Sequence, residues 1–382
     1  MKITSIDTFE VDPRWLFVRI DTDSGIVGWG EATLEGSSDV VTTAVKAFAE
    51  RLVGTEPRRI EDAWQRSTRG GFYRGGPVFS SAIAGIDMAL WDILGRSLRV
   101  PVHQLLGGHV RDEVRVYGWI GGDSPADVAG AARAQREAGL TAIKMNGSPQ
   151  RTHLPSEADD AEVIERAALV REALGPELDF AIDFHGRLSA PAARRLLPQL
   201  EPYHPLFVEE PVLTENNHAN LARLISSSPV PIATGERMYS RWDVLPALEA
   251  GVAVLQPDLA HAGGISEVRR IAALAETFDV AIAPHCPLGP LALAACLQVD
   301  FATPNFLIQE QSMGIHYNTT ADLLDFVQNP EVFAFTSGSI ARPLGDGLGV
   351  EINEDAVRRS AAKHQGWRTP IWDHTDGSFA EW

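Results

Sequence analysis

The stretch LDFAIDFH, residues 178–185, is a short apolar run that ends on a carboxylate and an imidazole, Asp183 and His185. On a β-strand, side chains two positions apart point to the same side. A strand end that meets water and turns on an Asp would explain one such pair. The pair does not stand alone, however, because seven other runs in the chain have the same form.

The eight apolar runs alternate with helical patterns from about residue 114 onwards. In order they are VRVYGWI (114–120), TAIKMN (141–146), LDFAIDFH (178–185), PLFVEE (205–210), PIATGE (231–236), AVLQPD (253–258), VAIAPH (280–285) and FLIQE (306–310). Strands alternating with helices predict a parallel sheet, and eight of them predict a closed β/α barrel. The active site of such barrels lies at the carboxyl ends of the strands.

Ionisable residues end these runs at nearly regular intervals. Six of them are separated by 26, 27, 22, 27 and 25 residues, close to one β/α unit each: Asp183, Glu209, Glu236, Asp258, His285 and Glu310. Solvated strand ends explain one or two such residues, but not six in step. We therefore expect a ring of functional groups around one rim of the barrel.

The first third of the chain has a different pattern. Residues 2–33 predict three antiparallel strands, with a turn at TDSG joining the last two. Helical patterns follow at about 38–53, 59–68 and 79–98. Between the last two lies RGGFYRGGP (69–77), which suits either a loop near a ligand or a flexible surface loop.

The composition narrows the function classes. The 382 residues carry a net charge of −18, which argues against nucleic acid and anionic membranes as partners. Two cysteines, no signal-peptide pattern and no apolar run approaching the roughly 18 residues of a membrane helix predict a soluble, cytoplasmic protein. An anionic substrate would need local positive charge from Lys, Arg or a metal ion.

The carboxylates Asp183, Glu209 and Glu236 come from three successive predicted strands. Converging carboxylates repel one another unless a cation lies between them, and all-oxygen ligation favours magnesium before calcium or manganese. Strand parity alone does not decide between Glu209 and its neighbour Glu210. The sequence thus predicts one Mg²⁺ that holds a substrate carboxylate and stabilises the charge left when an adjacent proton is removed.

Two histidines are candidates for proton transfer. Asp258 and His285 end neighbouring strands, and an Asp beside a His orients the ring and raises its basicity, which predicts a general base. His185 comes from another strand and could protonate a leaving hydroxyl at C3. Loss of water would leave an enol that becomes a 2-keto acid.

Several motifs together resemble the enolase superfamily, in particular its mandelate racemase group. They are FYRGGP, SAIAGID, DFHGR, EEPV, GERM, LQPDLAHAGGI, APHCPLGP, ALAACL, QEQSMGIHYN and the closing AEW, and they span essentially the whole chain. The resemblance implies an α+β capping domain (1–113), a (β/α)7β barrel (114–335) and a C-terminal segment returning to the cap (336–382).

The resemblance also implies roles for the rim residues. Magnesium would bind Asp183, Glu209 and Glu236. His285, made more basic by Asp258, would be the base and His185 the acid. Glu310 would stabilise the enediolate intermediate. A small sugar acid is the expected substrate, and a homo-oligomer is expected because family members are commonly oligomeric.

One departure from the group is informative. Many relatives end the second barrel strand with Lys-x-Lys, whose second lysine is a base on the opposite face. This chain has Lys144 but Asn146 in the second place. Because Asn146 cannot act as a base, elimination with one base is favoured over racemisation. Lys144 either binds the substrate carboxylate or pairs with a ligand carboxylate.

Substrate specificity is expected to come from loops above the rim. The segments VDPRW (11–15) and RGGFYRGGP should close over the polyol end of the substrate. Besides Lys144 and Asn146, the candidate substrate-binding residues are Arg14, Trp15, Arg74, Trp119 and His316.

Other interpretations remain at this point. A metal-dependent hydrolase barrel needs His-x-His on its first barrel strand, and VYGWIGG has no His. A non-catalytic sensor on the same fold should have lost a rim residue, and all are present. Gluconate, fuconate or another sugar acid fits the same chemistry.

Overall fold

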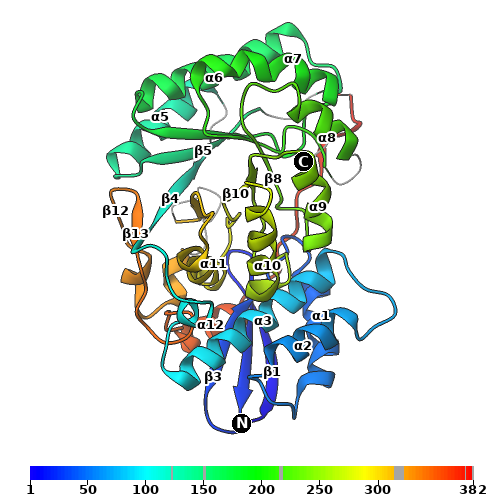
Figure 1. The fold of residues 1–382 in the computed structure, drawn as a ribbon, viewed down its shortest axis with the longest axis vertical. Helices are drawn as coiled ribbons and strands as arrows, with labels where there is room; N and C mark the ends of the chain where they lie inside the picture. Colours follow the sequence, from blue (N-terminus) through cyan, green and yellow to red (C-terminus); the bar gives the residue numbers. More distant parts are fainter. Residues whose placement is uncertain (122–123, 149–151, 215–217, 314–321, 375, 381–382) are drawn as a thin grey trace.

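The computed structural model describes residues 1–121, 124–148, 152–214, 218–313, 322–374 and 376–380. Figure 1 shows a smaller N-terminal domain, blue to cyan, beneath a larger β/α domain. The N-terminal domain, called the cap below, has three antiparallel strands and four helices: β1 (Ile3–Val11), β2 (Trp15–Thr22), β3 (Val27–Glu31), α1 (Ser38–Leu52), α2 (Ile60–Arg69), α3 (Pro77–Leu98) and the short α4 (Val102–Leu105). The predicted meander and its three helices are confirmed.

Helix α3 is the central helix of the cap. Gly28 and Gly30 let β3 pack directly on it, because a Cβ at either position would collide with the backbone oxygen of Ala89 or Gly85. By length and composition α3 could cross a membrane, so the expectation that no segment approaches that length is wrong. However, 78% of its apolar window is buried inside the protein, as in the core helix of a globular domain.

The β/α domain is a closed barrel. Its eight parallel strands are β4 (Glu113–Ile120), β5 (Ala142–Asn146), β6 (Asp179–Asp183), β7 (Val208–Glu209), β8 (Ile232–Thr234), β9 (Val254–Leu255), β10 (Ala281–Ile282) and β11 (Gln309–Gln311). Strands β4 to β10 pair in sequence order, and β11 returns to pair with β4. A bridge between Ile282 and Phe306 closes the remaining gap.

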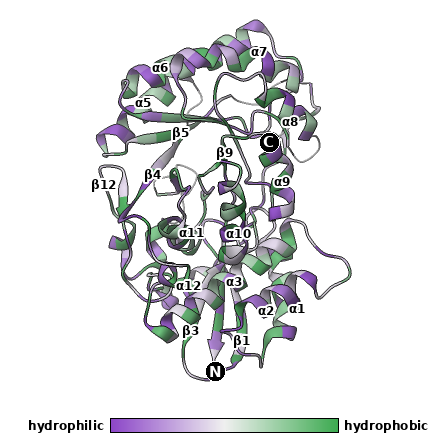
Figure 2. Ribbon diagram, viewed as in Figure 1, coloured by the Kyte–Doolittle hydropathy of each residue, from purple (hydrophilic) through white to green (hydrophobic). Residues whose placement is uncertain are grey.

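Seven helices connect these strands and complete the predicted (β/α)7β order. They are α5 (Pro125–Glu137), α6 (Glu157–Leu174), α7 (Ala190–Leu200), α8 (His218–Ile225), α9 (Arg241–Glu249), α10 (Gly264–Glu276) and α11 (Pro290–Ala302). Four begin at a serine whose hydroxyl caps the first turn: Ser124, Ser156, Ser189 and Ser240. Figure 2 shows both hydrophobic and hydrophilic residues along α7, and its buried residues, Ala192, Ala193, Leu196, Leu197 and Leu200, recur as expected for a helix with one face on the sheet.

Each barrel strand sends one side chain into a separate cluster inside the barrel. These residues are Tyr117, Ala142, Ala181, Phe207, Ala233, Val254, Ala283 and Ile308. Side chains two positions further along a strand point to the same side. Glu209 therefore follows Phe207 on the inward side, which resolves the choice between Glu209 and Glu210.

The C-terminal segment contacts both domains. Its elements are η2 (Leu323–Phe326), η3 (Pro330–Phe333), β12 (Phe335–Thr336), β13 (Ser339–Ala341), α12 (Glu354–Ala361), β14 (Trp372–Asp373) and β15 (Phe379–Ala380). Strand β13 pairs with β4 of the barrel. Directly after α12 the chain contacts the cap, where the His364 ring lies 2.9 Å from Asp12.

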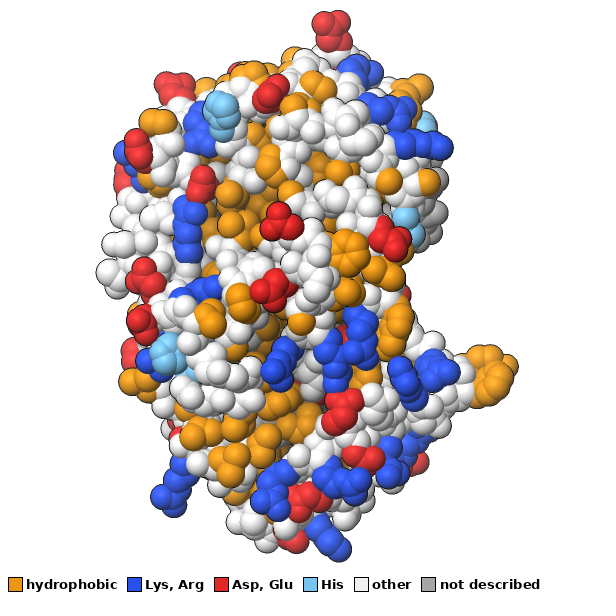
Figure 3. Space-filling view, in the orientation of Figure 1, with side chains coloured by type: hydrophobic (Ala, Val, Ile, Leu, Met, Phe, Trp, Pro, Cys, Tyr) orange, Lys and Arg blue, Asp and Glu red, His pale blue; other side chains and the backbone are white. Residues whose placement is uncertain are grey.

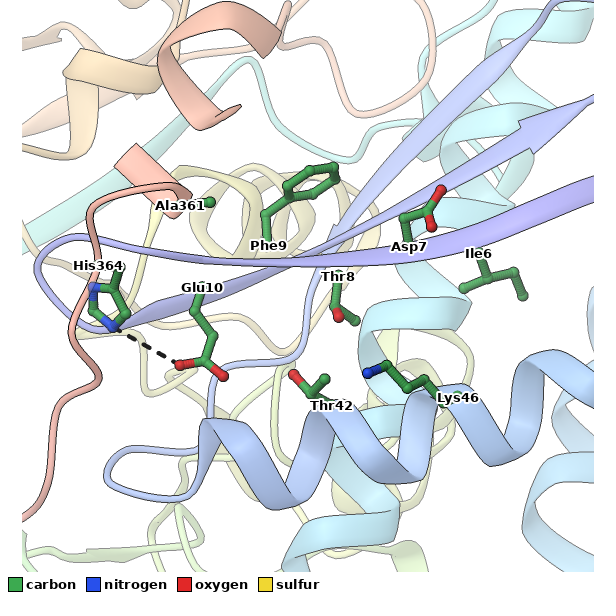
Figure 4. Close-up of a pocket in the computed structure, with 9 residues that line it drawn as sticks. All are labelled: Ile6, Asp7, Thr8, Phe9, Glu10, Thr42, Lys46, Ala361 and His364. Atoms are coloured by element: carbon green, nitrogen blue, oxygen red, sulfur yellow. Dashed lines mark ion pairs between the residues drawn. The ribbon is translucent and has the colours of Figure 1, made fainter. Parts of the chain in front are cut away.

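A surface cavity of about 420 Å³ lies where this segment meets the cap, between β1, α1 and residues 361–364 (Figure 4). Glu10, Lys46 and His364 line it, and none of the predicted rim residues does. The cavity is therefore separate from the candidate site described next.

Candidate active site

The carboxyl ends of the barrel strands carry a buried charge cluster built around Lys144. Its Nζ donates to both carboxylate oxygens of Glu209 at 2.9 Å. The same Nζ lies 3.0 Å from Glu310 and 3.5 Å from Asp183. All four side chains are at most 2% exposed. Of the two roles expected for Lys144, the structure shows the pairing with carboxylates.

Burial and the neighbouring carboxylate charge oppose the ionisation of Glu209. The pKa of Glu209 is raised well above its usual range by burial and by the charge of Asp183, against the stabilising charge of Lys144. Burial alone would lower the pKa of Lys144. The charges of Glu209 and Glu310 outweigh it and raise that pKa well above its ordinary value. Positive charge therefore strongly stabilises this cluster of carboxylates.

His285 lies between two carboxylates on the same rim. Its Nδ1 is 2.8 Å from Asp258 Oδ2, and its Nε2 is 3.0 Å from Glu236 Oε2. Burial would lower the pKa of His285, but the charges of Glu236 and Glu310 outweigh it and raise that pKa well above its usual range. Burial likewise opposes ionisation of Glu236, yet the charge of His285 holds its pKa well below the usual range.

Asp258 is fixed from below by its own turn. Its Oδ1 accepts the backbone N–H groups of Ala260 at 2.6 Å and His261 at 3.1 Å. The other oxygen, Oδ2, lies 2.8 Å from His285 Nδ1 and 3.5 Å from His261 Nδ1. An Asp that orients Nδ1 in this way leaves Nε2 as the nitrogen that exchanges a proton with substrate.

His185 reaches the rim by a different route from the one expected. Strand β6 ends at Asp183, so the two residues do not share a strand face. Instead the backbone turns to a left-handed conformation at His185 (φ 49°), and its N–H donates to Asp183 Oδ1 at 2.8 Å. The ring Nε2 lies 3.2 Å from Asp183 Oδ2. Burial lowers the pKa of His185, against the charges of Asp183 and Glu236 that raise it.

Three of the residues expected to contact substrate lie elsewhere in this structure. Arg14 donates to the carbonyl of Pro287 at 3.2 Å and lies 3.1 Å from Glu35. Trp15 is fully buried in the core. Arg74 lies on the exposed loop between α2 and α3, whose hydrophobic tip stands out from the surface at the right of Figure 3. The expectation that this loop closes over the polyol end of the substrate stays a prediction.

The other expected contacts are closer to the rim. Trp119 is adjacent to Lys144 in the β4–β5 ladder and is half-buried. Asn146 is adjacent to Asp183 in the next ladder, and its Oδ1 is buried without a hydrogen-bond partner among the described residues. His316 lies outside the described residues.

Two groups at this site were not predicted from the sequence. The Gln256 amide donates to Glu209 at 2.7 Å, and the backbone N–H of Cys286 donates to Glu310 at 3.0 Å. Gln256 could have been found, because in the predicted strand 253–258 it lies two positions before Asp258 and so on the same side. The backbone contact leaves no mark on the sequence.

The donor set fits a hard divalent cation. Asp183, Glu209 and Glu236 offer only carboxylate oxygens from three neighbouring strand ends. The positive charge they require is supplied by side chains, by Lys144 at Asp183 and Glu209 and by His285 at Glu236.

A tighter group of possible ligands is formed by Asp258, His261 and His285, whose ligand atoms lie within 4.8 Å of one another. The 2.8 Å contact between Asp258 and His285 Nδ1 is a hydrogen-bond distance, so we interpret this group as an oriented imidazole.

An Asp–His pair that faces buried carboxylates at the rim of a capped (β/α)7β barrel defines an enzyme of the enolase class. Residues 3–107 match the N-terminal domain of mandelate racemase/muconate lactonizing enzyme, and residues 127–356 match the enolase C-terminal domain-like family. The chain belongs to the mandelate racemase/muconate lactonizing enzyme family of the enolase superfamily.

Similar proteins support this membership over the full length. D-galactonate dehydratases from Ralstonia nicotianae (strain ATCC BAA-1114 / GMI1000) and Cronobacter sakazakii (strain ATCC BAA-894) are 53% and 51% identical, with both chains covered completely. Among solved structures, an enolase from Agrobacterium radiobacter with Na and L-malate bound has a TM-score of 0.91. It is 31% identical, and both chains are fully covered.

Proposed function

We propose that the protein is a magnesium-dependent sugar-acid dehydratase, which converts D-galactonate to 2-dehydro-3-deoxy-D-galactonate. The observation that carries the proposal is the rim itself. An oriented imidazole, His285, and a second imidazole, His185, approach one carboxylate cluster from different strands. That arrangement suits removal of a proton beside a carboxylate and protonation of a leaving hydroxyl.

Asp183, Glu209 and Glu236 would hold one Mg²⁺ per subunit. When bound, the ion would hold the substrate carboxylate and stabilise the extra negative charge that develops there as the C2 proton leaves.

His285 would act as the base through Nε2, because Asp258 holds Nδ1. In this structure Nε2 faces Glu236, so the ring must exchange that partner for the C2 proton. Glu310 is positioned by Lys144 and by the Cys286 N–H, and would contribute a hydrogen-bonding oxygen near the substrate carboxylate.

His185 would donate a proton to the C3 hydroxyl as it leaves. Its left-handed backbone and the bond from its N–H to Asp183 fix the ring beside the cluster. The C3–O bond breaks, water departs, and the resulting enol tautomerises to the 2-keto acid. Asn146 cannot act as a base in place of the second lysine, which favours elimination over racemisation.

The substrate assignment is supported by the curated relatives at 51–53% identity that are named D-galactonate dehydratase. The related enolase with bound L-malate, a small 2-hydroxy acid, supports an acid substrate. Trp119 and Asn146 are the structural candidates for contacts to it. Cytoplasmic location and homo-oligomeric assembly remain predictions, the latter to be checked by light scattering.

A screen of aldonic acids for 2-keto acid formation with Mg²⁺ tests the proposal. We expect D-galactonate to give the fastest turnover. Turnover of gluconate or fuconate alone would retain the chemistry and reject the substrate. No turnover of any sugar acid would favour the non-catalytic sensor.

A further inference from the structure

Two barrel helices start in an unusual way. Helices α10 and α11 follow the strand ends that carry Asp258 and His285, and both have a glycine, Gly263 or Gly289, at the N-cap position. A glycine has no side chain with which to accept the free N–H groups of the first turn. Helices α5, α6, α7 and α9 use their own serine instead.

The cap supplies the missing acceptor for α11. Glu31, at the end of β3, accepts the N–H of Gly289 at 2.8 Å and that of Ala292 at 2.9 Å. Thr33 also donates to this carboxylate, at 2.8 Å, and Glu31 is fully buried. A Cβ on Gly289 would collide with the carboxylate of Glu31, so the glycine makes room for this contact.

The cap also supplies the acceptor for α10. Asp87, on α3, accepts the N–H of Ser266 at 2.9 Å and its hydroxyl at 2.6 Å. Asp87 is 2% exposed, and a Cβ on Gly264 would collide with it. A carboxylate from the cap therefore binds the N-terminal end of each helix, where the helix dipole favours negative charge.

These contacts lie a few residues from the Asp–His pair. Glu31 binds the backbone four positions after His285, on the loop that also receives the Arg14 bond at Pro287. Asp87 binds the backbone eight positions after Asp258. The hydrogen bond between Asp258 and His285 thus joins two segments of the barrel. Asp87 of the cap binds the segment after Asp258, and Glu31 of the cap binds the segment after His285.

We infer that Glu31 and Asp87 are positioning residues for the Asp258–His285 pair: the cap sets the distance between base and orienting carboxylate by capping α10 and α11. The inference rests on the proposed role of His285 as base. It gives the cap a part in proton abstraction, besides any part in covering substrate.

The test uses Glu31→Gln and Asp87→Asn in the full-length protein. Gln offers one carbonyl oxygen in place of two, so it cannot accept both N–H groups of α11. We expect kcat to fall by about ten- to a hundredfold, the range that small misplacements of catalytic groups produce, with KM changed less than about threefold. The low-field proton resonance of the His285 Nδ1–H bond, assigned by its loss in His285→Asn, should shift or broaden.

Two matched controls separate positioning from general loss of stability. Ser124→Ala removes the capping box of α5, and Asp92→Asn alters another buried carboxylate of α3, which bonds Trp29 and Leu348 instead of the barrel helices. Both should lower the melting temperature yet leave kcat and the resonance unchanged. Should Glu31→Gln fail to fold, Ser266→Ala removes the hydroxyl bond to Asp87, together with the bond that this hydroxyl accepts from Trp91, and should shift the resonance more weakly.

Wild-type kcat and resonance in Glu31→Gln and Asp87→Asn would overturn the inference, as would equal shifts in the controls. The resonance needs no substrate, so it tests positioning even if no sugar acid is turned over. Absence of turnover in the wild type would instead count against the proposed function.

Discussion

Nε2 of His285 lies 3.0 Å from Glu236, so the proposed base and a proposed metal ligand are bonded to each other in this structure. Each supplies the charge that the other needs. A divalent cation on Glu236 would compete with His285 for that carboxylate. Cation binding and release of the base nitrogen are therefore expected to be coupled.

Removal of divalent ions should abolish turnover, and Mg²⁺ should restore it. Glu236→Gln should lose activity while keeping its fold, because it removes a ligand charge at the rim and no core packing. Turnover after chelation and readdition, with circular dichroism of the variant, checks both points. Full activity after exhaustive chelation would contradict the metal assignment.

Isotope exchange should distinguish the proposed roles of His285 and His185. His285→Asn should stop exchange of the substrate C2 proton with deuterated solvent, because the base is lost. His185→Asn should block loss of water while allowing that exchange. Proton NMR of the substrate in D₂O measures it. Exchange that persists without His285 would identify another base, with Lys144 the first to examine.

Lys144→Met should destabilise the metal-free protein strongly. The buried ammonium is bonded to Glu209 and Glu310, and removing one partner from a buried charge cluster typically costs about 3–5 kcal/mol. Mg²⁺ should raise the melting temperature more in this variant than in the wild type, because it replaces the lost charge. Lys46→Met, at an exposed lysine of α1, is the control. Equal Mg²⁺ shifts in all three proteins would exclude this electrostatic coupling.

The stability conferred by Glu31 should depend on pH. Burial raises its pKa from the ordinary 4.5 to about 7, against the bonds from Ala292, Thr33 and Gly289. The folded state therefore holds a proton that the unfolded state releases between these values, and stability present below pH 4.5 is lost as the pH rises toward 7.

Gln carries no such proton, so the stability difference between wild type and Glu31→Gln should shrink by about 3 kcal/mol from pH 4.5 to pH 8. Denaturant unfolding at both pH values measures it, with Glu50→Gln at an exposed site of α1 as control. A difference that grows with pH would show that the carboxylate is ionised throughout.

Selectivity at C4 should distinguish D-galactonate from D-gluconate. The proposed base, acid and metal ligands would contact the substrate at C1 to C3, which the two acids present alike. A buried polar group left unpaired by the C4 epimer typically costs about 1–3 kcal/mol, or roughly ten- to a hundredfold in kcat/KM. Values of kcat/KM for both acids at one Mg²⁺ concentration decide the point, and equal values would reject galactonate as the preferred substrate.

The rim residues could be predicted because ionisable residues recur at nearly regular intervals along the chain. Strands that end every 22 to 27 residues on an ionisable side chain identify Asp183, Glu236 and His285 without any knowledge of packing. The sequence could not show which side chains of a short strand face the barrel interior. Alternate residues point to opposite sides, but the pattern does not say which side is inward. Only the packing of Phe207 inside the barrel assigns Glu209 to the site.

The contacts between the two domains could not be predicted from the sequence. In the sequence Arg14 and Trp15 look like part of an accessible turn, yet Arg14 bonds the loop after His285, and Trp15 is buried as the first residue of β2. Glu31 and Asp87 sit in apolar segments of the cap, and their partners are backbone groups more than 170 residues away. Backbone N–H groups carry no residue-specific signal, so such pairings appear only once the domains are packed.

The barrel closes where β11 pairs with β4, and the complete site can form only after this pairing. Gln309 pairs with Val116, 193 positions earlier, and such distant pairings form slowly because loop-closure entropy must be overcome first. Glu310 lies on β11, so Lys144 meets it only after closure. During synthesis, a chain that has emerged only as far as β10 can therefore pair Lys144 with Asp183 and Glu209 but not with Glu310. The rim becomes chemically complete only when the eighth strand leaves the ribosome.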